Sequence, residues 1–430
     1  MSETRTIEVG YLARVEGEGS LRAEVIDGQL GDVEFNIFEP PRFFEGLLRD
    51  RRFTEAPDIT ARICGICPIA YQISAVTAME NVCGVAIDGA LQELRRLIYC
   101  GEYIESHALH IYLLHAPDFL GYDSGIAMAA DHRAIVERGL RLKQTGNEIV
   151  RVLGGREIHP VNVRVGGFWR LPTRVELQGL ATELDRARDE ALETVKWVSR
   201  LNIPQITRPV EFVALSDPDR YSFFEGRIRS TEGIDIDVSE WNDVFVEEHV
   251  QRSNALHARV RERGMFAVGP TARFALNHEK IQPVAAKAAA EAGLKPGVAN
   301  PFESIVVRAV ETLNAVEEAL VIIDSYEAPQ AANLAVEPVA GVGHGASEAP
   351  RGLLYHRYEI DDTGTIMEAQ LVPPTSQNQL SIEADVREVL GANLDKADDE
   401  LQWILEQSIR NYDPCISCAT HFLRLEVNRV

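Results

Sequence analysis

The stretches RICGIC (residues 62–67) and DPCISCATH (residues 413–421) lie near opposite ends of this chain, and each holds two cysteines separated by two residues. The four cysteines of these motifs are Cys64, Cys67, Cys415 and Cys418. Thiolates at this spacing bind soft or borderline metals such as zinc, iron, nickel and copper. The pairs bracket nearly the whole chain, so a shared metal requires a fold that brings its two ends together.

Three interpretations without a catalytic metal compete for these cysteines. A disulfide is disfavoured, because six cysteines in 430 residues are too sparse for a disulfide scaffold and the expected compartment is reducing. A structural zinc site with four cysteines is the strongest alternative, although such sites usually close a short loop. The third alternative is two unrelated pairs of core cysteines. Spacing alone leaves zinc and a catalytic metal equally open.

The charge balance excludes some classes of partner. The chain has 66 acidic and 43 basic residues and a net charge of −23, which argues against nucleic-acid and anionic-membrane surfaces. No apolar run reaches the roughly 20 residues that cross a bilayer. The first residues lack the basic and apolar regions of a secretory signal. We therefore expect a cytoplasmic protein with no nucleic-acid partner and no direct membrane insertion.

The patterning predicts an α+β fold that is mostly α-helical, a bundle of long helices with small antiparallel sheets. Residues 4–40 alternate in the strand manner around the turn Asp27-Gly28 and predict the first sheet. Thr173 with Glu176 is a candidate capping box, and Asn300 is a candidate cap for a helix that starts at Pro301. The segments with helical spacing are 68–84, 89–120, 127–155, 173–200, 301–327 and 381–410. Further strands are predicted within 205–245 and 352–372, and residues 1–421 are expected to form one domain.

Charged and polar residues accompany both cysteine pairs. Arg62 precedes the first pair and His421 follows the last cysteine by three positions. Glu16 lies in RVEGEG (residues 14–19), and Glu45 lies in PRFFEG, nineteen positions before Cys64. Four thiolates with acid–base groups in reach favour redox metal chemistry over a structural staple.

These motifs together resemble those of nickel–iron hydrogenase large subunits. Four internal motifs also occur in the order of that family: GGREIHP (154–160), VGPTARFALN (268–277), EAPRGLLYH (348–356) and QLVPPTSQN (370–378). Each internal motif is weak alone, whereas the two terminal motifs in the correct order are specific. The resemblance implies the large-subunit fold and a catalytic subunit that cleaves dihydrogen reversibly into protons and electrons.

The resemblance also implies roles for the thiols. Cys64, Cys67, Cys415 and Cys418 would bind nickel, and Cys67 and Cys418 would bridge it to an iron that carries carbonyl and cyanide. The terminal thiolate of Cys415 would accept the proton of heterolysis. Glu16 would pass that proton onward, since a carboxylate within hydrogen-bond reach of a thiol can relay it.

Five further residues receive roles by the same resemblance. Arg351, counted with the catalytic residues, would direct its guanidinium toward a cyanide on iron, and Thr375 would donate its hydroxyl to the other cyanide. Glu45, the carbonyl of Leu371 and His421 would bind Mg²⁺ or a second iron. Mg²⁺ prefers oxygen ligands and keeps several waters, so three protein ligands suffice.

Other residues are expected to have structural roles only. His107, His110 and His115 share part of a helix face, but no family position supports a metal there, and we expect packing or interface histidines. Cys83 and Cys100 fall in apolar helical stretches and are expected to be inert core cysteines.

The sequence departs from the common pattern of the family in three places, one of which is VPPTSQN (372–378), where the more usual version has tryptophan before the asparagine. Tyr71 stands four residues after Cys67, where many members have a histidine that can hydrogen-bond a bridging thiolate, and Glu18 replaces another frequent histidine. These changes affect the surroundings of the ligands and leave the four cysteines untouched.

The sequence predicts that the electrons leave through other chains. Two cysteines remain outside the motifs, too few for an iron–sulfur cluster, and no G-x-G-x-x-G motif indicates a dinucleotide site. The resemblance implies an iron–sulfur small subunit as partner. The cytoplasmic multi-subunit NAD(P)-linked or sulfhydrogenase type, which this chain resembles most, adds further iron–sulfur subunits and subunits that bind FAD and NAD(P).

The nine residues FLRLEVNRV (422–430) after His421 resemble the extension that a maturation endopeptidase removes from family members once nickel is inserted.

Two other functional classes stay open. One is the related quinone-site subunit of respiratory complex I, which generally lacks these cysteine pairs. The other is a non-enzymatic scaffold held by zinc, which metal content would distinguish.

Overall fold

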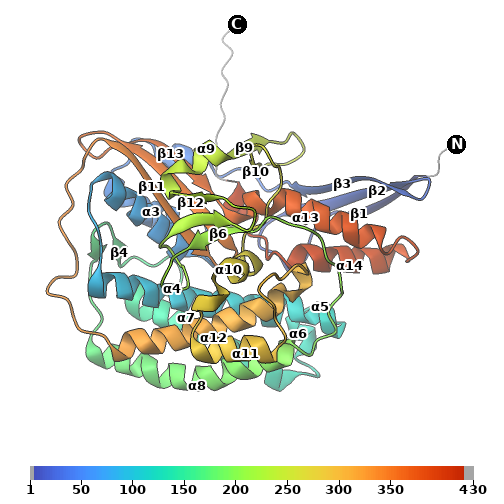
Figure 1. Cartoon of the computed structure of the whole chain (residues 1–430), viewed down its shortest axis with the longest axis horizontal. Helices are drawn as coiled ribbons and strands as arrows, with labels where there is room; N and C mark the ends of the chain where they lie inside the picture. Colours follow the sequence, from blue (N-terminus) through green and yellow to red (C-terminus); the bar gives the residue numbers. More distant parts are fainter. Residues whose placement is uncertain (1–3, 421–430) are drawn as a thin grey trace, which may run out of the picture.

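The computed structural model describes residues 4–420, so the expectations on His421 and on residues 422–430 lie outside the described part. Long helices lie side by side in the lower half of Figure 1, and small antiparallel sheets lie above them. The helices of this layer are α4 (Gly89–Leu109), α7 (Arg133–Gly154), α8 (Arg174–Val198), α11 (Pro283–Glu291) and α12 (Ser304–Asp324). This arrangement confirms the predicted mostly helical α+β fold.

Helix α12 is the centre of the helical layer. It is buried along nearly its whole length and packs against α4, α8 and α11. The helix was predicted to start at residue 301, and a 3₁₀ turn over Pro301–Glu303 occupies that position before α12 begins. The side chain of Asn300 caps this turn, because it accepts a hydrogen bond from the backbone amide of Phe302 at 3.1 Å. The capping box of Thr173 and Glu176 at the start of α8 is also present.

Helix α3 (Pro68–Val82) lies between the helical layer and the sheets and begins directly after Cys67. Two further helices, α13 (Pro374–Gly391) and α14 (Asp398–Arg410), lead toward the C-terminal cysteine pair. Shorter helices relevant to the site are α1 (Phe44–Leu48), α2 (Ala56–Thr60), α5 (Ala116–Leu120) and α10 (Pro270–Asn277). Between α4 and α5 the chain makes a π-helical turn over His110–His115.

The N-terminal sheet has three antiparallel strands and projects to the right in Figure 1. The strands are β1 (Thr4–Val9), β2 (Gly19–Ile26) and β3 (Gln29–Ile37). Asp27 and Gly28 form the predicted turn with φ of 51° and 75°, in the left-handed region that such hairpin turns require. The apolar face of the sheet packs against α13 and α14. The link between β1 and β2 carries Glu16 toward the interior.

The central sheet contains a strand that the sequence patterning missed. Its strands are β11 (Gly341–Ala349), β12 (Gly352–Ile360) and β13 (Ile366–Val372), of which the patterning predicted the last two. The sequence of β11, GVGHGASEA, lacks clear alternation because its glycines serve packing. A Cβ on Gly343 would lie 2.1 Å from the carbonyl oxygen of Ala78, and one on Gly345 would lie 2.2 Å from that of Ser74. The glycines therefore allow α3 to lie directly on the strand.

The remaining sheets are small. The predicted strands within 205–245 form a sheet of β6 (Val213–Ser216), β7 (Arg227–Ser230) and β8 (Asp235–Ile236). A further hairpin pairs β9 (Phe245–His249) with β10 (Leu256–Val260), which patterning did not predict. Within residues 4–420, every helix is too short or too polar to cross a membrane.

Candidate metal centre

The four cysteines of the terminal motifs meet in one buried cluster. Their sulfurs all lie within 4.8 Å of one another, and each residue is at most 3% exposed. Sulfur–sulfur distances are 3.5 Å for Cys64 with Cys415, 4.0 Å for Cys67 with Cys418 and 2.8 Å for Cys415 with Cys418. Among the described residues, this is the one cluster of side chains suited to a metal ion.

The first pair is held by the start of α3. Cys64 precedes the helix, and its sulfur accepts hydrogen bonds from the backbone amides of Ile66 and Cys67, both at 3.3 Å. The buried carboxylate of Glu102 on α4 accepts from the amides of Ile69 and Ala70 at 2.6 and 3.1 Å. Those amides lack partners within their own helix, so Glu102 fixes the helix end beside the cysteines.

Glu16 is tied to the second pair by backbone and side chain together. Its backbone forms a parallel β-bridge with Cys415, and its carbonyl accepts from the amide of Ile416 at 2.9 Å. Its carboxylate lies 3.1 Å from the sulfur of Cys415 and accepts from the amide of Ser417 at 3.1 Å. The structure therefore brings the predicted relay group against the predicted proton acceptor.

Arg42 links the two cysteine segments, a role that sequence reasoning did not assign. Its guanidinium donates to the carbonyl oxygen of Ile63 at 2.7 Å and to that of Ser417. Its backbone amide donates to the carbonyl of Thr420 at 2.7 Å. The position of this arginine within PRFFEG, three residues before Glu45, was the available signal.

The four thiols of the cluster oppose one another's ionisation. Burial and the neighbouring thiol of Cys418 raise the pKa of Cys415 well above its usual value, whereas hydrogen bonds from Cys415 and the other thiols lower the pKa of Cys64. Four adjacent thiols titrate as one coupled group, in which each ionisation opposes the next. A bound metal removes that opposition, because it takes thiolates as ligands.

Arg351 lies beside the cluster on the other side. It is 2% exposed, and its Nε donates to the carbonyl of Asp413 at 2.7 Å while Nη2 pairs with the Asp413 carboxylate at 3.1 Å. Nη1 is buried without a partner among residues 4–420. The charges of Asp413, Cys415 and the first pair raise the pKa of Arg351 against the effect of its burial. One N–H of a fixed cation thus remains available to a group bound at the sulfurs.

Asp413 was missed by sequence reasoning, although it stands two positions before Cys415. It is buried, and its Oδ2 lacks a hydrogen-bond partner among the described residues. Burial raises its pKa, and the charge of Arg351 opposes that rise. The sequence shows Asp413 next to the second cysteine pair, but it does not show that Asp413 pairs with Arg351.

Thr375 and Tyr71 complete the surroundings of the sulfurs. The hydroxyl oxygen of Thr375, near the start of α13, accepts from the backbone amide of Cys415 at 2.9 Å. Tyr71 is buried on the first turn of α3, and burial and the charge of Cys418 raise its pKa well above the usual value. The phenol thus stays protonated beside the sulfur cluster.

Two of the three predicted magnesium ligands are neighbours. The amide of Leu371 on β13 donates to the carboxylate of Glu45 on α1 at 2.8 Å. Burial, with a contribution from Glu247, raises the pKa of Glu45 to about 8. His421 lies outside the described residues, so the third ligand of this site stays a prediction.

The histidines that sequence reasoning left out of the metal site are buried in the helical layer. His107 lies 2.9 Å from the carboxylate of Glu311, and His110 contacts the carbonyl of Arg410 at 2.8 Å. The ring of His115 packs 5.0 Å from that of His110. Burial lowers the pKa of His107 to about 4, so it is neutral at physiological pH.

The two remaining cysteines have different surroundings. Cys100 is fully buried in α4, as expected for a core cysteine. Cys83 is only half-buried, because it caps the C-terminal end of α3 at the edge of the core.

The cluster fits a nickel–iron centre better than a plain zinc staple. Four buried sulfurs within 4.8 Å of one another can bind either. A structural zinc site needs neither a carboxylate at hydrogen-bond distance from one sulfur nor a fixed arginine with a free N–H. Glu16 and Arg351 supply both.

Comparison with known proteins agrees with this geometry. Residues 42–138 and 258–421 match the family of nickel-dependent hydrogenases. The chain is 32% identical to sulfhydrogenase 1 subunit alpha of Pyrococcus furiosus over 97% of this chain and 98% of that protein. It is 27% identical to the NAD-reducing hydrogenase HoxS subunit beta of Cupriavidus necator over 98% of this chain and 95% of that protein.

A solved structure shows the same fold. The structure of an NAD⁺-reducing [NiFe]-hydrogenase in the H₂-reduced state superimposes with a TM-score of 0.90 at 26% identity, covering 97% of this chain and 99% of that one.

Proposed function

The chain belongs to the nickel-dependent hydrogenase family and is a hydrogenase catalytic subunit, and from that premise we propose how its residues act. The buried cluster of four sulfurs with the Glu16 carboxylate 3.1 Å from Cys415 carries this proposal. Cys64, Cys67, Cys415 and Cys418 would hold the nickel, and Cys67 and Cys418 would also be ligands of an iron that would carry carbonyl and cyanide. When bound, this centre supplies a soft electrophilic metal pair at which dihydrogen is polarised.

The proton leaves through Cys415 and Glu16. The sulfur of Cys415 accepts the proton, and the Glu16 carboxylate at 3.1 Å takes it next. The amide of Ser417 holds the same carboxylate oxygen, so the acceptor stays oriented toward the sulfur. In the direction of dihydrogen formation the two residues deliver the proton in reverse order.

Arg351 and Thr375 are proposed to orient the diatomic ligands. The unpartnered Nη1 of Arg351 would donate to one cyanide, while the bonds of Arg351 to Asp413 keep the guanidinium from rotating. Thr375 would donate its hydroxyl hydrogen to the other cyanide, because its oxygen already accepts from the amide of Cys415. Glu45, the carbonyl of Leu371 and His421 would bind Mg²⁺ or a second iron.

The partner that takes the electrons docks beside the first cysteine pair. Segment 155–169 exposes the apolar side chains of Ile158 (59%), Val161 (41%) and Trp169 (61%). Ile158 approaches this loop, and His159 contacts the carbonyl of Ala61 at 2.6 Å. An iron–sulfur small subunit on this patch would lie close to the sulfur cluster.

The names of the relatives support a proposal of further subunits. One relative is called subunit alpha of sulfhydrogenase 1, and the other is called subunit beta of the NAD-reducing hydrogenase HoxS. We propose a cytoplasmic complex in which additional iron–sulfur subunits and subunits with FAD and NAD(P) follow the small subunit. A maturation endopeptidase is proposed to remove residues 422–430.

Elemental analysis with infrared spectroscopy tests the proposal on protein purified with its co-expressed partners. The expected result is nickel with iron and absorption bands of carbonyl and cyanide. Zinc alone without those bands, in fully matured protein, would show that the four cysteines have a structural role and would overturn the proposed function.

A further inference from the structure

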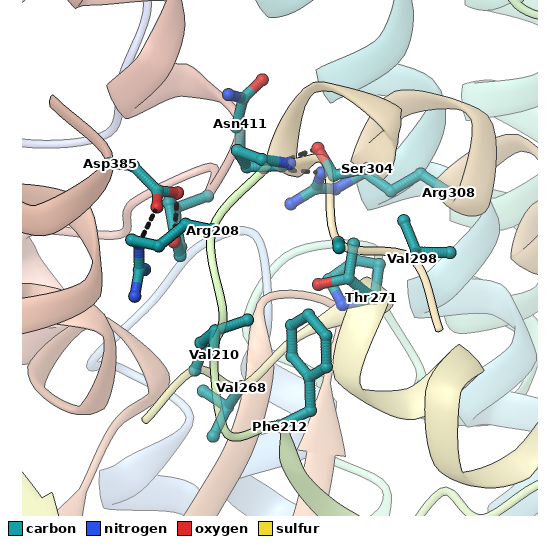
Figure 2. A pocket seen from close by; sticks show the side chains of 15 residues that line it. Arg208, Val210, Phe212, Val268, Thr271, Val298, Ser304, Arg308, Asp385 and Asn411 are labelled. Carbon is teal, nitrogen blue, oxygen red and sulfur yellow. Dashed lines mark hydrogen bonds and ion pairs between the residues drawn. The ribbon is translucent and has the colours of Figure 1, made fainter. Parts of the chain in front are cut away.

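A narrow cavity lies between α10, α12 and the segment before β6, and Asn411 and Tyr412 also line it. It has room for only one or two water-sized groups, about 30 Å³. Figure 2 shows Arg308 and Thr271 on one side and the pair Arg208–Asp385 on the other. No residue assigned to the metal centre lines it.

Arg308 is a buried cation without an ion-pair partner. Its side chain is fully buried, and among residues 4–420 no carboxylate lies within ion-pair distance of it. Its Nη1 donates to the carbonyl of Asn411 at 2.9 Å, whereas Nε and Nη2 have no partner there. Burial lowers the pKa of Arg308 to about 10, which still leaves it charged at neutral pH. A buried cation of this kind is stabilised by an anion that accepts its free N–H groups.

The other charges at the cavity are already paired. The carboxylate of Asp385 accepts from Arg208 at 2.7 Å and from the hydroxyl of Tyr412 at 2.6 Å. The more distant acids Glu311 and Asp413 pair with Arg273 and Arg351. Asp413 and Glu311 therefore act on Arg308 only at longer range, and Arg308 has no direct carboxylate partner at this cavity among the described residues.

Two helix starts add to the positive potential at the cavity. Helix α12 begins at Ser304, one turn before Arg308, and α10 begins at Pro270. The N-terminal end of a helix carries a partial positive charge that favours anions. In Figure 2 the hydroxyl of Thr271 points into the same space.

The lining and the size limit what can bind. The walls include the apolar side chains of Val210, Phe212, Val268 and Val298. Apolar walls favour weakly hydrated ions, and about 30 Å³ excludes nucleotides and larger metabolites. We propose that this cavity binds a small monovalent anion, of the size of a halide or formate, through the free N–H groups of Arg308.

The site also borders the segment that carries the second cysteine pair. Both Arg308 and Ser304 donate to the carbonyl of Asn411 at 2.9 Å. Two residues farther on, Asp413 holds Arg351 beside the sulfurs. An anion on Arg308 would therefore compensate the charge that anchors this segment.

Bromide and formate test the proposal on the holoenzyme complex, purified in gluconate buffer of constant ionic strength. Replacing gluconate by either small anion is expected to raise the thermal midpoint in a saturable way. Bromine-edge anomalous diffraction on crystals of the same complex is expected to show a peak in the cavity beside Arg308. Competition between the two anions would show that they share the site.

Three variants make the test specific. Arg308→Met is expected to abolish the shift, and so is Ala299→Leu, which fills the cavity while Arg308 stays intact. Arg188→Gln removes an arginine of α8 that pairs with Glu317, and it is expected to keep the full shift. If Arg308→Met does not fold, the Ala299→Leu variant and the diffraction experiment still show whether the anion binds in this cavity. Only water beside Arg308 in bromide crystals, or an unchanged shift in Ala299→Leu, would overturn the proposal.

Discussion

The carboxylate of Glu16 lies 3.1 Å from the sulfur of Cys415, although nearly the whole chain separates the two residues. A β-bridge between their backbones sets this distance. Flexibility of the glutamate side chain alone would leave the carboxylate in many positions. The backbone link therefore makes proton transfer between these groups a property of the fold.

Glu16→Gln is expected to keep the metals and to slow proton exchange by about 10²- to 10⁴-fold, the usual contribution of a positioned acid–base group. The amide preserves the hydrogen bond from Ser417 but cannot accept a proton at neutral pH. Isotope exchange between D₂ and water measures the effect. Glu8→Gln, at an exposed residue of strand β1, is the matched control and should exchange at the wild-type rate. Fast exchange in Glu16→Gln would place the relay elsewhere.

Cys415→Ser is expected to reduce dihydrogen turnover to background. A serine hydroxyl is a harder donor than a thiolate and ionises far less readily, so it replaces neither the ligand nor the proton acceptor. Dihydrogen-dependent dye reduction and nickel content are the measurements. Cys83→Ser, at a half-buried thiol outside the cluster, should leave both unchanged. Equal turnover in Cys415→Ser would refute its role.

Arg42→Met is expected to lower the nickel and iron content of the purified complex. The guanidinium joins the carbonyls of Ile63 and Ser417, and without it the two cysteine segments lose their direct link. Metal analysis per subunit gives the result independently of activity. Arg133→Met on the exposed face of α7 removes the same charge without touching the centre and should bind metal normally. Full metal content in Arg42→Met would show that the link is dispensable.

Glu105→Gln is expected to flatten the pH dependence of stability. Burial raises the pKa of Glu105 on α4 from 4.5 to about 8. The folded state thus keeps a proton that the unfolded state releases, and the free energy of unfolding falls as pH rises through this range. The upper limit of this loss is about 5 kcal/mol at roughly 1.4 kcal/mol per pKa unit.

Thermal midpoints between about pH 5 and 8 measure this effect, and the slope should be smaller in Glu105→Gln than in the wild type. Glu183→Gln on the exposed face of α8 is the control and should retain the wild-type slope. Identical slopes for all three proteins would show that Glu105 does not hold the proton.

Gly345→Ala is expected to destabilise the protein by several kcal/mol, since its Cβ would lie 2.2 Å from the backbone oxygen of Ser74 and force α3 away from β11. Gly179→Ala in α8 is the matched control. A Cβ there meets no atom within 4 Å, and alanine in a helix is favoured over glycine by about 0.5–1 kcal/mol. The free energy of unfolding, measured with denaturant, should therefore fall in Gly345→Ala and rise in Gly179→Ala. A stable Gly345→Ala protein would contradict the close packing of α3 on β11.

Local signals in the sequence predicted several elements correctly. Thr173 with Glu176 and Asn300 before Pro301 mark helix starts, because caps satisfy backbone groups within a few residues. Strand β11 was not predictable in this way. Glycine is required in this strand because the backbone of α3 lies too close for a side chain. This contact joins segments that are far apart in the chain.

The sequence by itself determined which chemistry is available: two CxxC motifs supply soft ligands, and Glu16 and Arg351 supply a proton acceptor and a cation. The tertiary structure decided which atoms meet. Arg42 and Asp413 acquire their roles only where the two ends of the chain converge. The reason is physical, because side-chain chemistry is fixed by residue type, whereas contacts between distant residues depend on how the helices and sheets between them pack.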